Sequence, residues 1–253
     1  MVSIITPSYN SEQFIATTIQ SVINQTHKDW ELIIVDDVSM DDTHSIISGF
    51  LKTDNRIQFL KQEKNLGTGA ARNLGIKAAQ GNFIAFLDAD DVWKPTKLET
   101  QLKYMKNNNA AICFSSYELI NEFGEPLNKL IEALPKLSYQ KQLKCNYIGN
   151  LTGIYNVDIL GKAYMPEIRK RQDWVMWLNL LEKGGSAIGI KESLAYYRVR
   201  KDSVSSNKLN LITYNFNVYR KALGFSFTKS TKYLALFLYE YFFVKSKQTK
   251  SIN

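Results

Sequence analysis

The feature that most constrains the fold of this 253-residue chain is a regular alternation of short apolar segments with longer amphipathic ones. The apolar, β-branched segments predict strands, and the segments with apolar residues three or four positions apart predict helices. Strands are expected at 2–6, 32–35, 57–60, 83–87 and 111–116, and helices at 11–24, 43–52, 67–79 and 95–106. This order is typical of an α/β fold, in which helices flank a mainly parallel sheet.

The fourth predicted strand ends in three carboxylates. An apolar run at 83–87 leads directly into Asp88, Asp90 and Asp91. Asp88 and Asp90 are two positions apart, so on an extended backbone both side chains point the same way and repel unless a cation lies between them. Such hard oxygen ligands select Mg²⁺ or Mn²⁺. The alternative is that Asp90 or Asp91 caps the helix that begins near Pro95.

Polar residues follow three of the predicted strands. Tyr9 and Asn10 follow the first strand, Asp36 and Asp37 the second, and the acidic cluster at 88–91 the fourth. Because the carboxyl ends of parallel strands meet at one edge of the sheet, these side chains are expected to build a single site.

The composition is that of a soluble globular protein, with 45% hydrophobic and 22% charged residues. Cys113 and Cys145 lack metal-binding spacing, and no signal-like segment opens the chain, which predicts a reduced, cytosolic setting. No apolar run is long enough to span a bilayer. The net charge of +8 is scattered, without a nucleic-acid-reading motif. An anionic membrane surface or a phosphate-bearing substrate fits this charge at least as well, and no nucleic-acid partner is expected.

The second half of the chain is less regular. Residues 121–144 predict loop and a short helix, and 151–160 a strand that leads into a turn. Further on, the sequence predicts a helix at 173–183, a short strand at 195–199, a polar loop at 203–207 and two closing helices at 209–223 and 228–244. We therefore expect a domain of residues 1–205, with halves 1–117 and 118–205, and a C-terminal helical region of residues 206–253.

Residues 233–244 in that C-terminal region are unusually aromatic and are flanked by lysines. The segment is too short to span a membrane, but its composition suits a helix that lies in the membrane interface. The alternative is a core helix packed on the preceding domain.

The tripeptide Gly67-Thr68-Gly69 invites comparison with a dinucleotide-binding fingerprint, but the comparison fails. The sixth position is Arg72 rather than glycine, and the charged loop 61–65 separates the glycines from the preceding strand. Arg72 could instead donate hydrogen bonds to the phosphates of a nucleoside diphosphate. The alternative is a solvated helix residue.

Five motifs in the first 95 residues occur in the order of a known family. They are Val2-Ser3-Ile4-Ile5-Thr6-Pro7-Ser8-Tyr9-Asn10; Ile33-Ile34-Val35-Asp36-Asp37 with Ser39; Asp41-Asp42-Thr43; Asn65-Leu66-Gly67 with Ala71-Arg72-Asn73-Leu74-Gly75; and Phe86-Leu87-Asp88-Ala89-Asp90-Asp91. With these motifs the chain resembles the inverting nucleotide-sugar glycosyltransferases of family 2, which have the GT-A fold. Residues 169–174 and 197–205 make it most similar to bacterial enzymes that extend lipid-linked surface polysaccharides, such as teichuronic acid or O-antigen glucosyltransferases.

The resemblance implies a role for each matching residue. Tyr9 and Asp37 would contact the nucleobase, expected to be uracil, with the backbone of Pro7 and Ser8 beside them. Asp88 and Ala89 would lie at the ribose and sugar of the donor, and Asp90, with Asp88, would bind Mn²⁺ or Mg²⁺. Asp173 would be the general base. The setting Gln172-Asp173-Trp174 departs from the family pattern, and the later basic motif of processive synthases is absent.

Asp173 is also a candidate base on chemical grounds. Inverting sugar transfer needs a group that takes the proton of the attacking hydroxyl. The two histidines, His27 and His44, are predicted to lie away from the strand ends, which favours a carboxylate. Asp173 opens a predicted helix, so helix capping is the alternative.

Aromatic and basic residues surround the candidate base. Trp174 could stack on an acceptor sugar, and Arg169 and Arg171, in a basic triplet with Lys170, could hold the diphosphate of a lipid-linked acceptor. A solvated surface cluster is the alternative for the triplet.

The expected function is metal-dependent transfer of a sugar from a UDP-sugar to a hydroxyl of a lipid-diphosphate-linked glycan, at the cytoplasmic face of the cell membrane. A sugar-phosphate nucleotidyltransferase is one alternative, although residues 8–14 lack the glycine-rich phosphate loop that it needs. A non-catalytic nucleotide-sugar-binding protein is the other.

Overall fold

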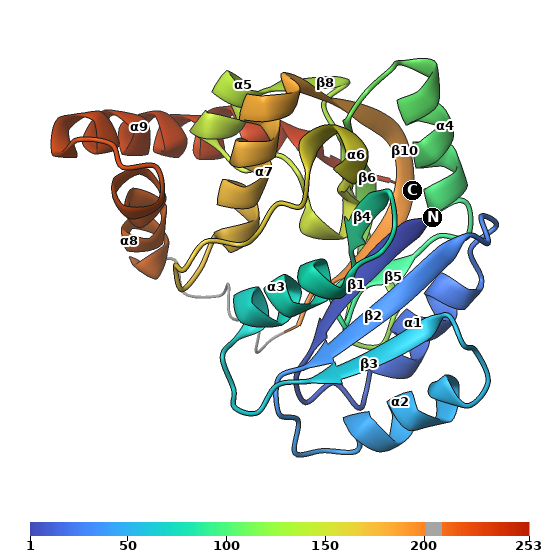
Figure 1. The fold of residues 1–253 in the computed structure, drawn as a ribbon. Helices are drawn as coiled ribbons and strands as arrows, with labels where there is room; N and C mark the ends of the chain where they lie inside the picture. The colour runs from blue at the N-terminus through green and yellow to red at the C-terminus, as the bar shows by residue number, and fades with distance from the viewer. Residues whose placement is uncertain (201–208, 253) are drawn as a thin grey trace.

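Four parallel strands form the regular part of the sheet (Figure 1). The computed structural model describes residues 1–200 and 209–252. In it, β1 (Val2–Ser8) lies between β2 (Trp30–Asp36) and β4 (Phe83–Phe86), and β3 (Ile57–Lys61) pairs with β2. All three pairings are parallel, which confirms the sheet expected from the sequence.

The helices between these strands also match the sequence expectation. They are α1 (Ile15–Ile23), α2 (Thr43–Leu51), α3 (Thr68–Ala78) and α4 (Lys97–Asn107). Alternate residues of the strands face opposite layers. Ile4 and Leu32 pack in one cluster with α1, α2 and α4, whereas Ile5 and Ile33 pack in the other with α3 and α7 (Gln172–Gly184). The strands are buried on both faces, as the continuous apolar runs predict.

The other half of the sheet is mixed. The antiparallel strand β9 (Ile154–Asn156) lies between β4 and β6 (Ile112–Ile120), and β7 (Pro126–Ile131) and β11 (Thr249–Ser251) continue the sheet beyond β6. The long strand β10 (Ser186–Arg198) runs parallel to β6 and antiparallel to β5 (Val92–Trp93) and β8 (Lys136–Ser138). The short elements are α5 (Tyr139–Lys144), α6 (Val157–Leu160) and 3₁₀ turns at Asn150–Thr152 and Lys245–Gln248.

Two sequence expectations for this half are wrong. Residues 121–144 were expected to be loop and a short helix, but besides the helix α5 they hold the strands β7 and β8. The first four residues of β7 are exposed, so it lacks the apolar alternation that marks a strand. The strand expected at 195–199 is the end of the 13-residue β10, whose polar middle contains two register shifts.

The C-terminal segment packs on the second half of the domain. The polar loop expected at 203–207 lies outside the described residues. The described chain resumes with α8 (Leu209–Asn217), which continues into a π-helical turn (Val218–Ala222). Next, α9 (Phe227–Tyr239) continues into a second π-helical turn (Glu240–Val244). Tyr219 and Phe237 are buried against Trp174 of α7, so this segment completes the larger core.

The opposite side of the C-terminal segment is exposed. Phe227, Tyr239, Phe242 and Phe243 each expose 60% or more of their surface. Figure 1 shows α8 and α9 at one end of the molecule, beside α5 and α7. In the described part of the chain, no helix has both the length and the apolar character needed to cross a bilayer.

Candidate active site

The carboxyl ends of β1, β2 and β4 meet at one edge of the sheet. In the parallel register, Ser8 lies opposite Asp36, and Ile5 opposite Phe86. The polar residues that follow these strands are therefore neighbours, as the sequence predicts.

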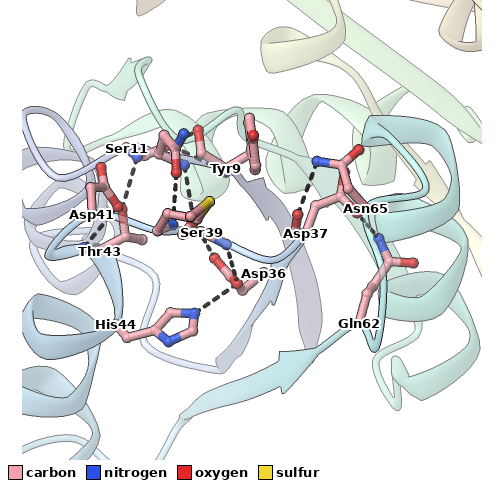
Figure 2. Close-up of polar contacts among 12 residues, drawn as sticks. Tyr9, Ser11, Asp36, Asp37, Ser39, Asp41, Thr43, His44, Gln62 and Asn65 are labelled. Atoms are coloured by element: carbon pink, nitrogen blue, oxygen red, sulfur yellow. Dashed lines mark hydrogen bonds and ion pairs between the residues drawn. The ribbon is translucent and has the colours of Figure 1, made fainter.

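At the end of β2, Asp36 organises the following loop. Its buried carboxylate accepts hydrogen bonds from the Ser39 amide (2.9 Å) and the Ser39 hydroxyl (2.5 Å), and lies 2.7 Å from Nε2 of His44 (Figure 2). Burial alone would raise the pKa of Asp36, but these contacts lower it. The expectation that His44 lies away from the strand ends is wrong, because α2 turns its first residues back toward β2.

Asp37, the predicted nucleobase contact, holds the loop that leads into α3. Its buried carboxylate accepts hydrogen bonds from Nε2 of Gln62 (2.6 Å), the Leu66 amide (2.8 Å) and the Gly67 amide (2.8 Å). Asn65 donates to its carbonyl oxygen (Figure 2). A carboxylate has about four acceptor positions. The carboxylate of Asp37 therefore mainly stabilises the loop that leads into α3. About one of its acceptor positions remains for a ligand.

The residues at the end of β1 differ in accessibility. Pro7 and Ser8 are buried, and Tyr9 is 51% exposed. The Ser8 hydroxyl is buried without a hydrogen-bond partner in the part of the chain that the structure describes. The Asn10 amide donates to the Ser39 hydroxyl in the loop after β2. The Ser11 amide donates to the hydroxyl of Thr43, the first residue of α2 (Figure 2). Tyr9 thus exposes about half of its surface beside two segments that are hydrogen-bonded to each other.

Arg72, on α3, is buried among carboxylates. Its Nη2 lies 2.5 Å from Oδ1 of Asp88, and Asp91 and Asp173 are close enough to act on it electrostatically. Burial would lower the pKa of Arg72, but these carboxylates raise it overall. Its Nε has no partner in the described part of the chain. The alternative of a solvated helix residue is therefore wrong.

Arg198, the last residue of β10, and Arg200, just after it, contact Asp90 and Asp91. Nη1 of Arg200 lies 3.0 Å from Oδ2 of Asp90, the Arg198 amide donates to Asp91 (2.9 Å), and Nε of Arg198 donates to the Asp90 carbonyl (2.8 Å). Burial raises the pKa of Asp90 and, more strongly, that of Asp91, and the neighbouring carboxylates raise both further.

Asp91 therefore does not cap the following helix. α4 begins only at Lys97, with no side-chain cap, and Asp91 binds β10 instead. Arg198 and Arg200 were given no role from the sequence. The available signal was their two-residue spacing at the end of a predicted strand, which puts both on one side of an extended chain.

Asp173 lies in the first turn of α7, next to the start of α3. The two helices approach closely at Gly69, where a β-carbon would lie 2.2 Å from the side-chain amide of Gln172. This contact brings Asp173 near Arg72, although the two lie 101 positions apart in the sequence. The N-cap of α7 is Arg171, and the carboxylate of Asp173 accepts a hydrogen bond from Asn146 (2.9 Å).

Trp174 does not line this site. It is fully buried, its Nε1 donates to the Gln142 carbonyl (2.8 Å), and its ring packs on Tyr219 and Phe237. The expectation that Trp174 stacks on a sugar is therefore wrong, since the side chain of this third residue of α7 lies in the core.

The residues of the basic triplet, Arg169, Lys170 and Arg171, have two different environments. Lys170 lies over the ring of Tyr214 (4.9 Å), and Nε of Arg171 donates to Asn215 (3.1 Å), so both face α8. Arg169 is exposed and lines a cavity of about 650 Å³ between the start of α3 and the loop 165–169. A second cavity, of about 460 Å³, lies beside Arg200 between the loops 10–14 and 40–41.

The chain was compared with known families and proteins. Residues 3–158 match the family described as Glycosyl transferase family 2. This chain belongs to that family. The family recognised from the sequence motifs is therefore confirmed. This membership excludes the alternative that the chain is a sugar-phosphate nucleotidyltransferase.

Relatives cover nearly the whole chain. It is 44% identical to the putative teichuronic acid biosynthesis glycosyltransferase TuaG of Bacillus subtilis, over 91% of this chain and 92% of that protein. It is 39% identical to WfgD of Escherichia coli, a UDP-Glc:α-D-GlcNAc-diphosphoundecaprenol β-1,3-glucosyltransferase, over 86% of this chain and 85% of that protein.

Solved structures confirm the GT-A fold. TarS of S. aureus in complex with UDP-GlcNAc matches with a TM-score of 0.74 and 22% identity, over 95% of this chain and 73% of the TarS chain. The mannosyltransferase PcManGT from Pyrobaculum calidifontis, in complex with GDP-Man and Mn²⁺, matches with a TM-score of 0.70 and 15% identity, over 98% of this chain and 71% of that chain.

Proposed function

We propose that this protein transfers a sugar from a UDP-sugar to a hydroxyl of a lipid-diphosphate-linked glycan in bacterial surface polysaccharide synthesis, with inversion. The observation that carries the proposal is the convergence of Asp173 with the Arg72–Asp88 pair at the carboxyl edge of the sheet. The name of TuaG supports the role in polysaccharide synthesis, and that of WfgD supports the donor and acceptor classes. UDP-glucose is therefore the first donor to test.

In this reaction Asp173 takes the proton of the acceptor hydroxyl. The hydroxyl oxygen then bonds to the anomeric carbon on the face opposite the nucleotide, and the bond from that carbon to the phosphate oxygen breaks, releasing UDP. The departing diphosphate gains negative charge, which cationic groups stabilise. Arg72 is the nearest buried cation on α3, and Arg200 reaches the same acidic cluster from β10.

Asp88 and Asp90 fit a divalent cation. Their carboxylates are close enough for Asp88 to raise the pKa of Asp90, although burial contributes more, and each is balanced by an arginine. The described residues hold no group of three acidic, histidine or cysteine side chains that could bind a metal, so diphosphate oxygens and water would complete the coordination. Mn²⁺ or Mg²⁺ would supply charge neutralisation at the diphosphate.

For the donor, Tyr9 is proposed to stack on uracil, with Asp37 accepting the imide N–H in its remaining acceptor position. The hydroxyl of Ser8, which has no partner among the described residues, and the backbone around Pro7 and Ala89 would lie along the nucleoside. Ala89 itself is buried, and its carbonyl accepts a hydrogen bond from Thr18 (3.0 Å), which ties this segment to α1.

The exposed aromatic residues of the C-terminal segment support peripheral association with the cytoplasmic face of the membrane. Phe242 and Phe243 are exposed, whereas Phe237 of the same segment is buried in the core. Exposed aromatic rings beside lysines are typical of surfaces that enter the membrane interface. Of the flanking lysines, Lys245 donates to the Asn146 carbonyl and Lys250 pairs with Glu132, so both bind within the protein.

A donor screen tests the proposed activity. The protein is incubated with Mn²⁺ and a panel of UDP- and GDP-sugars, and release of free nucleotide is measured. We expect release from a UDP-sugar, its loss with EDTA and its recovery with Mn²⁺. No release from any UDP-sugar would contradict the donor class, and full release in EDTA would contradict the metal requirement.

Substitution Asp173→Asn tests the general base. The amide cannot take the hydroxyl proton, so transfer from UDP-glucose to α-D-GlcNAc-diphosphoundecaprenol should fall by roughly 10²-fold or more. UDP affinity, measured by calorimetry, should not change. Near-normal turnover of the variant would remove Asp173 from the mechanism.

Charge reversal at Arg169 tests the acceptor site. Arg169→Glu should raise the KM of the same lipid acceptor by about tenfold, the effect of one lost charge-assisted hydrogen bond, and leave the KM of the donor unchanged. Lys183→Glu, at the exposed far end of α7, is the matched control. Equal effects on donor and acceptor would defeat the assignment.

Membrane association is tested by flotation with vesicles that contain anionic phospholipid. The double variant Phe242→Ser, Phe243→Ser should lose most vesicle binding, because about 60% of each ring is exposed. Phe123→Ser is the control, since Phe123 is 80% exposed in the loop between β6 and β7, outside the C-terminal segment. Unchanged binding of the double variant would count against a membrane surface here.

A further inference from the structure

A segment that lies outside the family motifs forms a hydrogen bond with the carboxylate of Asp173. Nδ2 of Asn146 donates to Oδ2 of Asp173 at 2.9 Å. Asn146 follows α5, 27 positions before Asp173, and is partly buried. An amide N–H bond to one carboxylate oxygen leaves the other oxygen for a substrate proton.

The orientation of the Asn146 amide is fixed by its neighbours. Its Oδ1 accepts a hydrogen bond from Nε2 of Gln142 (2.8 Å), so its Nδ2 must face Asp173. Gln142 is fully buried, and its Oε1 accepts from the Tyr147 amide (2.8 Å). Its carbonyl accepts from Trp174, the residue next to Asp173 (2.8 Å). The donor and the carboxylate therefore belong to one connected network.

The C-terminal segment closes over this network. Lys245 donates to the backbone carbonyl of Asn146. Glu240 is buried, accepts a hydrogen bond from the Tyr147 hydroxyl (2.5 Å) and pairs with Lys141. Glu240 and Lys245 stand at the two ends of a π-helical turn (Glu240–Val244), so one turn contacts the segment 141–147 on both sides of Asn146. Such turns occur frequently at functional sites.

Cationic side chains lie on two sides of Asp173. Arg72 lies on the donor side, and Lys245 and Arg171 lie on the C-terminal side, close enough to act on one another electrostatically. The carboxylate thus stands between a cation of α3 and a cation of the C-terminal segment.

We propose that Asn146 is a positioning residue for the general base, and that Lys245 and Glu240 make the C-terminal segment part of the catalytic architecture. The inference rests on the proposed function of Asp173. A base held by packing and by hydrogen bonds from surrounding residues keeps its geometry for proton transfer. The C-terminal segment would then be required for turnover irrespective of membrane contact.

The test compares Asn146→Ala and Asn146→Asp in the full chain, with UDP-glucose and α-D-GlcNAc-diphosphoundecaprenol as substrates. Asn146→Asp keeps the shape of the side chain but removes the N–H donor. We expect kcat to fall about 10- to 100-fold in both variants, the effect of one hydrogen bond to a charged group. The KM of the donor and the melting temperature should stay close to those of the unchanged protein. Lys245→Met should lower kcat in the same way.

Two controls complete the design. Asn108→Ala removes an exposed asparagine that bonds only to its own helix, and Lys247→Met removes an exposed lysine two positions from Lys245. Both should behave as the unchanged protein does.

The outcomes separate this inference from the proposed function. Normal kcat in both Asn146 variants, with Asp173→Asn inactive, would overturn the positioning role alone. A rise in donor KM or loss of UDP binding in both variants would also overturn it, because Asn146 would then be structural. Full activity of Asp173→Asn would defeat the base assignment and this inference with it.

Discussion

The site depends on the buried guanidinium of Arg72. A cation and several carboxylates can share a buried site only if they pair, since each alone would be costly to desolvate. Arg72 binds Asp88 directly and acts on Asp91 and Asp173 through space. It therefore links the acidic end of β4 to the proposed base, and without it these carboxylates would repel one another. Its position follows from α3, which begins where Asp37 binds the Gly67 amide.

The two halves of the domain meet where α3 and α7 begin. The absence of a side chain at Gly69 lets Gln172 approach, and this contact places Asp173 near Arg72 of α3. Behind α7, Trp174 anchors the helix in a core that Tyr219 and Phe237 complete. The C-terminal segment therefore has a buried side, which packs on α7, and an exposed side with aromatic rings.

Local pattern predicted the first half of the fold well, because buried parallel strands are continuous apolar runs and the helices between them are strongly periodic. The same rule failed at β7, an exposed strand with no apolar face, and at β10, which is interrupted by polar residues and register shifts. It also misplaced Trp174, since a sequence shows that an aromatic residue is near a base but not to which side its ring turns. Asn146 and His44 carry no sequence signal for their partners.

The sequence by itself determined the α/β class, the family, the acidic strand end and the candidate base. Each of these depends on neighbours along the chain or on a motif of fixed spacing. Only the tertiary structure decided which groups balance the carboxylates. Arg72, Arg198 and Arg200 reach them from α3 and β10, and Asn146 reaches Asp173 from the segment after α5. Charge pairing and hydrogen bonding act over a few ångströms in space, and only the packing of the two halves brings these positions within that distance.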